Sequence, residues 1–177
     1  MKTGENSLRL EIDAQDARDG LWIEPVLRGD FVITSSGRLQ GRSLHCRGND
    51  WSQFGYPHYS GSMDFEQTFY WEQSEGDWEA DLVFRKPPGG TVEIFLNDLA
   101  LGSILWAPWR LPIREGLKPG LNRLRLRVTN TLQNFILGKG QPSGPLEDVE
   151  IQIFSGSQGC RARLAQPIDR AAKEFAA

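Results

Sequence analysis

Cysteine is scarce in this sequence, since Cys46 and Cys160 are the only cysteines among 177 residues. Two thiols so far apart in the chain do not make a disulfide framework, although a single bridge between them stays open. Long apolar runs are absent as well, because no stretch approaches the roughly 20 apolar residues that a membrane helix requires. Residues 1–20 contain no apolar signal-peptide core. We therefore expect a cytoplasmic protein that does not act in a membrane.

Neither sign of charge dominates, since 20 basic and 23 acidic residues give a net charge of −3. Nucleic-acid-binding proteins usually show a basic excess or a basic stripe, so no nucleic-acid partner is expected. Hydrophobic residues make up 39% and charged residues 24%, a composition that excludes a disordered or collagen-like chain. The length of 177 residues suits one domain with a core of its own.

The sequence lacks the short motifs that mark common enzyme sites, including G-x-S-x-G, G-x-G-x-x-G and H-E-x-x-H. Most acidic residues lie at exposed strand positions or turns, and no pair of them is singled out by the apolar surroundings that raise a carboxyl pKa. The only carboxylates worth naming are Asp50, beside Trp51, and the pair Asp64 and Glu66 on one strand face. We expect no catalytic residues and no enzyme activity from this chain.

Metal ligands are sparse too, because the sequence has no C-x-x-C pair and only two histidines. A site made of His45, Cys46 and His58 is weakly supported, since adjacent residues on a strand point to opposite faces. We expect the two histidines to be hydrogen-bonded surface residues, and we expect no metal site or cofactor from the motifs.

Several stretches alternate apolar and polar side chains with period two, which is typical of half-buried β-strands. These stretches are residues 63–71, 78–85, 92–97, 123–128 and 149–153. Turns rich in glycine and proline separate them, and no helical pattern of 10–15 residues lies between them. The pattern predicts an all-β fold, an antiparallel β-sandwich of the jelly-roll type. The outward Arg123, Arg125 and Arg127 fit either a solvated face or an edge guarded against pairing.

The expected organisation is a polar N-terminal segment at 1–25, a β-sandwich domain at 26–154 and a C-terminal tail at 155–177. The tail begins with the flexible stretch SGSQG. Residues 166–176 fit either a short helix or a disordered end.

Aromatic side chains gather in two predicted loops. Trp51, Tyr56 and Tyr59 lie in the glycine-rich stretch 47–62, and Trp106 and Trp109 flank Pro108. Flat aromatic rings with amide or carboxylate neighbours match the apolar faces and polar rims of sugars. Trp and Tyr in sandwich loops also plug the ends of the core. Both interpretations stay open at this point.

Residues 91–138, TVEIFLNDLALGSILWAPWRLPIREGLKPGLNRLRLRVTNTLQNFILG, contain a recognisable order of residues. The stretch resembles the galactose-binding-like, sugar-binding jelly-roll domain of family-two and rhamnosidase-type glycoside hydrolases. The upstream NDWSQFGYPHYSGSMDFEQTFYW resembles the entry to the same domain, so the resemblance covers about residues 45–154. The matching residues are Asn97, Gly102, Trp106, Pro108, Leu117, Gly120, Asn122, Leu124, Val128, Asn130, Asn134 and Gly138.

Three departures from the family pattern are visible. Asp98 replaces the usual glycine after Asn97, Trp109 replaces the usual tyrosine after Pro108, and Leu111-Pro112-Ile113 replaces an acidic motif. In the relatives the catalytic carboxylates belong to a separate barrel domain, which nothing here resembles. Folds of this type often hold a structural calcium ion, but no ligand set can be named for this chain.

The resemblance implies a non-catalytic domain that binds carbohydrate or assists the catalytic domain of a glycoside hydrolase. The alternative is a purely structural module that packs against a catalytic domain or a partner chain. The candidate carbohydrate-binding residues are Trp51, Tyr56, Tyr59, Asn97, Trp106, Trp109, Asn130 and Asn134. Exposed tryptophan or tyrosine side chains at one loop end would favour binding.

Overall fold

A computed structural model describes residues 4–16, 18–21, 25–41, 48–72, 77–138, 140–155 and 158–162. The chain divides into two compact units, Met1–Asp30 and Phe31–Ala177. The described residues of the first unit form no helix and no strand, so the sheet structure belongs to the second unit. Within the described part of the chain, no helix is both long and apolar enough to cross a membrane.

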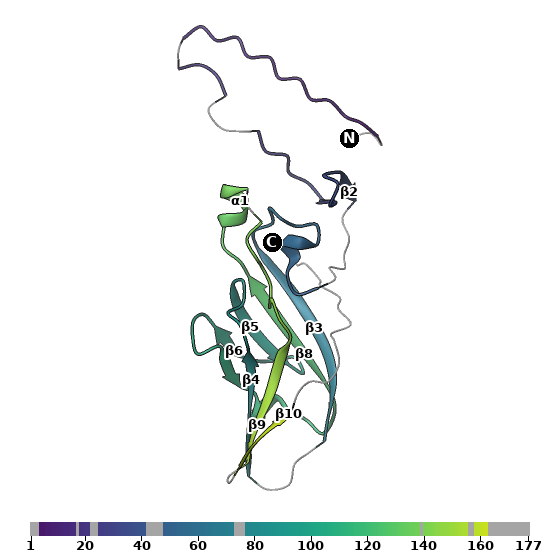
Figure 1. Cartoon of the computed structure of the whole chain (residues 1–177), viewed down its shortest axis with the longest axis vertical. Coiled ribbons are helices and arrows are strands. Elements are labelled where there is room, and N and C mark those ends of the chain that lie inside the picture. The colour runs from purple at the N-terminus through teal and green to yellow at the C-terminus, as the bar shows by residue number, and fades with distance from the viewer. Residues whose placement is uncertain are drawn as a thin grey trace. The chain divides into compact units, whose positions relative to one another are not determined.

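Two four-stranded antiparallel sheets build the second unit (Figure 1). The first, called the β8 sheet, has the order β3 (Ser62–Trp71), β8 (Gly120–Thr129), β5 (Thr91–Leu96) and β6 (Leu99–Ile104). The second, called the β4 sheet, has the order β10 (Gln158–Ala162), β9 (Val149–Ser155), β4 (Trp78–Phe84) and β7 (Arg110–Pro112). This arrangement confirms the predicted all-β antiparallel sandwich.

The remaining elements are short. β1 (Phe31–Ile33) and β2 (Leu39–Gly41) pair with each other and join neither large sheet. The chain also forms the 3-10 turns η1 (Trp51–Gln53) and η2 (Arg114–Gly116) and the helix α1 (Gln133–Leu137). α1 ends at Gly138, whose φ of 61° is the left-handed conformation that glycine adopts most readily.

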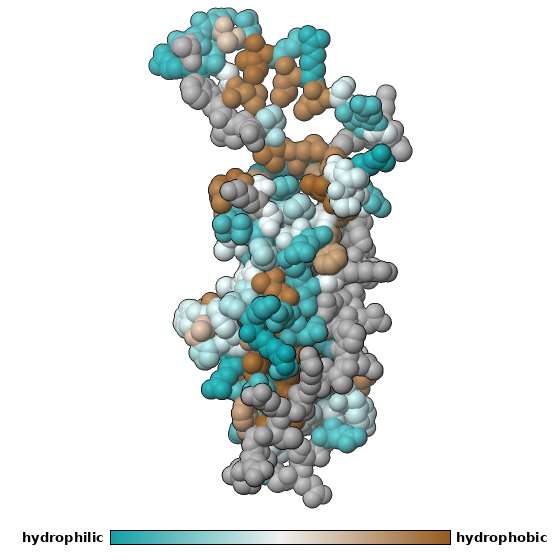
Figure 2. Space-filling model, in the orientation of Figure 1, coloured by the Kyte–Doolittle hydropathy of each residue, from teal (hydrophilic) through white to brown (hydrophobic). Residues whose placement is uncertain are grey.

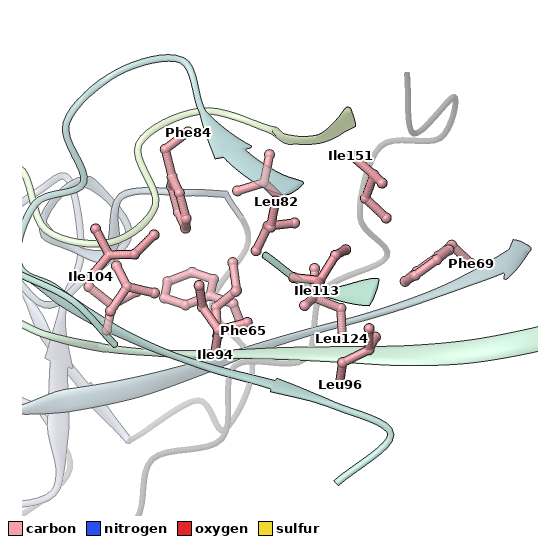
Figure 3. Packing of buried hydrophobic residues seen from close by; sticks show 14 of the residues in the cluster. Phe65, Phe69, Leu82, Phe84, Ile94, Leu96, Ile104, Ile113, Leu124 and Ile151 are labelled. Carbon is pink, nitrogen blue, oxygen red and sulfur yellow. The ribbon is translucent and has the colours of Figure 1, made fainter. Parts of the chain in front are cut away.

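The core lies between the two sheets and follows the period-two alternation of the sequence. Met63, Phe65, Phe69 and Trp71 of β3 are buried, as are the inward side chains of the other long strands. Figure 3 shows residues of the β4 sheet facing residues of the β8 sheet, with Ile113 between them. Each fully buried side chain of this kind contributes roughly 1.5–3 kcal/mol, so this apolar layer is the main stabilising feature.

Strand register defines the two ends of the sandwich. One end is called the α1 end. There β3 begins at Ser62, opposite Thr129, and β4 ends at Phe84, opposite Val149. The N–H of Gly89 donates to the carbonyl of Gly144 at 2.8 Å, joining two loops of this end. At the far end, called the β9–β10 end, Trp78 pairs with Ser155. The α1 end gathers the long loops that carried the aromatic candidates.

The structure corrects one expectation about β8, and two further features lie beside the predicted domain boundaries, which stay predictions. β8 is a central strand between β3 and β5, so its arginines do not guard an edge. Residues 158–162 form β10 against β9, so a strand lies in the stretch expected to be a tail. The first unit extends to Asp30, beyond the predicted boundary after residue 25. The C-terminal helix expected over 166–176 lies outside the described residues.

Candidate functional site

The topology brings all the candidate residues except Asn97 to the α1 end. Loop 105–109 leaves β6 after Ile104, which pairs with Val92, and enters β7 at Arg110, which pairs with Val83. The long loop 48–61 leads into the first residue of β3, and the chain after β8 carries the two asparagines. The candidates gathered here are Trp51, Tyr56, Tyr59, Trp106, Trp109, Asn130 and Asn134.

Trp51 is a core residue rather than a surface ring. Its side chain is fully buried, stacks on Phe65 with ring centroids 6.1 Å apart, and meets the edge of Tyr59 at 6.0 Å. The local chain folds inward because the Asp50 carboxylate caps η1, accepting a hydrogen bond from the Ser52 N–H at 3.0 Å. Trp51 therefore plugs the α1 end, which is the structural one of the two interpretations left open above.

The side-chain amides of Asn130 and Asn134 form hydrogen bonds with other groups of the protein. Asn130 accepts from the Gly61 N–H at 2.8 Å and donates to the Tyr59 carbonyl at 2.9 Å. Asn134, which is 1% exposed, accepts from the Gln141 N–H at 2.7 Å. Both amides also donate to the Ser143 hydroxyl, at 2.9 and 3.1 Å. These side chains hold the loops of the α1 end together.

Asp50 completes the same buried network. Its carboxylate accepts from the Ser52 hydroxyl at 2.6 Å, the Ser143 N–H at 2.9 Å and the Gln53 amide at 3.0 Å. A carboxylate satisfied by this many donors serves as a structural acceptor. Asp50 thus has a local role that requires no ligand.

Asn97 lies at the opposite end and shapes the β5–β6 hairpin. Its φ is 53° and that of Asp98 is 67°, the pair of positive values that a type I′ turn requires. The Asn97 amide donates to the Gly116 carbonyl at 2.8 Å and to the Asn122 side chain at 2.7 Å. Asn97 is therefore separated from the other candidates and tied to a turn.

Trp106 is the candidate that presents its ring to solvent. It is 72% exposed, whereas Trp109 of the same loop is partly buried and packs against the core. The Trp109 carbonyl accepts from the Phe84 N–H at 2.9 Å, and the Arg110 N–H donates to the Pro108 carbonyl at 2.8 Å. Trp106 therefore stands on a loop that is anchored to the β4 sheet just after it.

Tyr56 and Tyr59 occupy an intermediate position. Both are partly buried, and their rings meet edge to face with centroids 6.2 Å apart. The Tyr59 hydroxyl donates to the Ser62 carbonyl at 2.9 Å, which fixes the ring against the start of β3. Each packs against the core cluster and retains a partly exposed surface at the α1 end.

The outer face of the β8 sheet holds a charge cluster that the sequence pattern did not reveal. Asp64 is only 1% exposed although it points away from the core, because Arg125 and Arg127 cover it. The hydrogen bond to Asp64 raises the pKa of Arg127, with burial acting in the opposite direction. The sequence does show acids at alternate positions over residues 64–66 and arginines at alternate positions over residues 123–127. The two strands that carry them pair antiparallel in the structure.

No metal centre is evident in the part of the chain that the structure describes, where no three His, Cys, Asp or Glu side chains gather. His58 is exposed, and His45 and Cys46 lie outside the described residues. A structural calcium ion stays a prediction from the resemblance, with no ligand set to support it.

Comparison with known proteins finds relatives that match this chain over only part of their own length. No protein-family model matches the chain. A protein of Formosa agariphila, provisionally named beta-glucuronidase, is 30% identical over 92 residues, or 48% of this chain and 7% of that protein. A 3-phosphoshikimate 1-carboxyvinyltransferase of Clostridium botulinum is 27% identical over 168 residues, or 89% of this chain and 35% of that protein. The chain thus spans much less than two thirds of either relative.

Among solved structures, a rhamnosidase from Novosphingobium sp. PP1Y is similar to this chain with a TM-score of 0.50 and 19% sequence identity. The match covers 78% of this chain and 16% of the rhamnosidase. At this identity the similarity concerns the fold. A fold similar to the sandwich described above therefore also occurs as a small part of that rhamnosidase.

Proposed function

We propose that this chain is a non-catalytic, carbohydrate-binding accessory domain of a glycoside hydrolase, with the galactose-binding-like jelly-roll fold of family-two and rhamnosidase-type enzymes. The observation that carries the proposal is the exposed ring of Trp106 on loop 105–109. An open indole face is the group on which the apolar face of a sugar stacks. Loop 105–109 is anchored after Trp106, so little ordering cost accompanies binding.

The partly exposed Tyr56 and Tyr59 extend the proposal to the same end of the sandwich. Ligand sites combine apolar rings with a few placed polar groups. Trp51, Asn130 and Asn134 support this surface from beneath, because their ring or amide groups are committed to the core and the loops. The proposed contact residues are therefore Trp106, Tyr56 and Tyr59, and Trp109 of the same loop as Trp106 packs against the core.

The non-catalytic part of the proposal is supported by the state of the named carboxylates. Glycoside hydrolysis uses two carboxyl groups about 5–10 Å apart, one of them set to donate a proton. Asp50 accepts hydrogen bonds from three neighbouring residues, and Asp64 is covered by two arginines. Carboxylates engaged in this way are suited to holding structure.

An alternative function, a structural module that packs against a catalytic domain or a partner chain, is favoured by one observation. α1 and its N-cap expose apolar side chains, and Figure 2 shows such side chains gathered over this helix. Leu132 is 65% and Ile136 68% exposed. Exposed apolar groups that lie together often mark a protein contact.

A glycan-array screen of the whole chain tests the proposed function. Trp106→Ala is expected to abolish binding, because it removes the stacking surface. Tyr70→Ala is the matched control, since Tyr70 is also 72% exposed but belongs to β3 near the β9–β10 end. Binding that survives Trp106→Ala, or an array without any bound glycan while circular dichroism shows an intact fold, would contradict the proposal and favour the structural module.

The double variant Leu132→Ser, Ile136→Ser distinguishes the two proposed functions by testing the exposed apolar residues at α1. Both side chains are mostly exposed, so the variant should fold. A carbohydrate-binding domain should keep its glycan affinity in this variant. A structural module should instead lose association with the catalytic domain of its parent enzyme, measured by size-exclusion chromatography of the mixture.

A further inference from the structure

Three cations lie at the α1 end of the β4 sheet. Arg110 opens β7 directly after the loop that carries Trp106. Arg85 and Lys86 follow Phe84, the last residue of β4, whose N–H donates to the Trp109 carbonyl at 2.9 Å. The three cations and loop 105–109 therefore share one corner of the sandwich.

Each of these cations is paired with a carboxylate that lies deeper than the cation does. Arg110 is 56% exposed and its partner Asp81 is 16% exposed. Arg85 is 52% exposed against 13% for Glu150, and Lys86 is 64% exposed against 34% for Glu147. The pairs are formally neutral, but an approaching ligand meets the positive groups first.

At the other end of the same sheet, the carboxylates are more exposed than the cation that pairs with them. There Arg114 bridges Asp77 and Glu79, and the arginine is 41% exposed while the acids are 95% and 65% exposed. The ion pairs of the β4 sheet therefore place cations outermost near loop 105–109 and carboxylates outermost near the β9–β10 end.

Arg110 also retains hydrogen-bonding capacity. Its contact with Asp81 joins Nε to Oδ2 at 3.7 Å, which is too long for a hydrogen bond. A guanidinium has five N–H donors in a planar fork that fits a carboxylate in bidentate fashion. The geometry leaves the terminal nitrogens of Arg110 available for such an acceptor on a ligand.

From this arrangement we propose that the carbohydrate bound at Trp106 is an acidic glycan, whose uronate carboxylates are bound by Arg110 with Arg85 and Lys86 beside it. The inference rests on the proposed function, since it names the ligand class of that site. Trp106 supplies a face for stacking the sugar ring, and Arg110 selects sugars that carry a carboxylate. Neutral glycans gain the stacking contact without the charge-assisted hydrogen bonds.

Isothermal titration calorimetry on the full chain tests the inference with matched pairs of ligands. The panel holds oligosaccharides of galacturonate, glucuronate, mannuronate and guluronate, each beside its carboxyl-reduced, neutral counterpart. We expect about tenfold tighter binding of at least one acidic member over its neutral counterpart, as one charge-assisted hydrogen bond provides. The difference should shrink between about 50 mM and about 500 mM salt because of screening.

The variants assign the effect to residues. Arg110→Gln should remove the preference for the acidic member and leave the affinity for its neutral counterpart unchanged. Arg123→Gln is the matched control, because Arg123 is 47% exposed and ion-paired but lies on the β8 sheet. Trp106→Ala should weaken the binding of both the acidic oligosaccharide and its neutral counterpart. A preference that survives Arg110→Gln, or falls equally in Arg123→Gln, would overturn the inference.

The remaining outcomes separate this inference from the proposed function. Equal affinity for acidic and neutral members, or binding of neutral glycans alone on the array, overturns the acidic ligand and keeps the carbohydrate-binding domain. Equal affinity for an oligonucleotide of the same charge shows a general polyanion surface and also overturns the inference. Absence of binding to every glycan overturns both proposals together.

Discussion

Arg127 of β8 binds Asp64 of β3 through two hydrogen bonds, from Nε to Oδ1 at 2.9 Å and from a terminal nitrogen to Oδ2 at 3.2 Å. Arg125 adds a third to the same carboxylate at 3.3 Å and lies over the Phe95 ring, 3.8 Å from its centroid. The two arginines bury a carboxylate on the outside of a sheet, and both also lie over the Phe95 ring of β5. The cluster thereby links three adjacent strands of the β8 sheet.

Asp64→Ala should destabilise the chain by about 2 kcal/mol, because two partly buried guanidinium groups lose their acceptor and rehydrate incompletely. Glu66→Ala should cost at most about 1 kcal/mol, because Glu66, on the same strand, is 20% exposed and pairs with the solvent-exposed Arg123. Urea unfolding followed by tryptophan fluorescence measures both. Equal losses of stability in the two variants would show that the burial of Asp64 adds nothing to the stabilising effect of its ion pairs.

The inward faces of the strands were predictable from sequence, because period-two alternation depends on neighbouring residues of one strand. The burial of Asp64 was not, because it depends on Arg127, which is distant in sequence and meets it only through strand pairing. For the same reason the sequence did not show that β8 is central. Pairing order is a property of the assembled sheet and leaves little trace in a single strand.

The candidate site was predicted in part. The sequence grouped the aromatic residues into two loops, and strand register brings those loops to one end of the sandwich. It did not distinguish Trp51 from Trp106, since both lie in predicted loops that contain glycine or proline. The difference arises because η1 turns Trp51 into the core and loop 105–109 leaves Trp106 outside.

Trp51→Ala should cost about 3–5 kcal/mol of stability, since it removes a fully buried indole and leaves a cavity beside Phe65 and Tyr59. Trp106→Ala should change stability by at most about 0.5 kcal/mol, because its side chain is mostly in solvent. Differential scanning calorimetry compares the two variants. A similar loss in Trp106→Ala would show that this ring packs on the protein and is not free for a sugar.

Gly144→Ala should destabilise the α1 end by at least about 2 kcal/mol. A Cβ at this position would lie 2.2 Å from the Asn49 carbonyl oxygen, and φ of 127° disfavours any side chain. Gly120→Ala is the matched control, because φ is 90° there but nothing lies within 4 Å of the added atom. Its loss should be about 1 kcal/mol, from strain alone. Comparable melting temperatures for the two variants would contradict the clash.

Adjacent residues of the β5–β6 hairpin should respond to glycine in opposite directions. Asp98→Gly should stabilise the chain by about 0.5 kcal/mol, because a two-residue type I′ turn favours glycine at its second position, where φ is 67°. The contact that it removes, between Asp98 and Arg123 at 3.8 Å, is solvent-exposed and of little energetic weight.

Asn97→Gly should instead cost about 1–2 kcal/mol, although φ of 53° suits glycine there as well. The Asn97 amide donates to the Gly116 carbonyl and accepts from the Arg123 N–H at 3.1 Å, and glycine makes neither contact. Chemical denaturation of the two single variants gives the sign of each change. A gain in both variants would mean that backbone conformation alone governs this turn, whereas a loss in both would mean that the Asp98 side chain supports it.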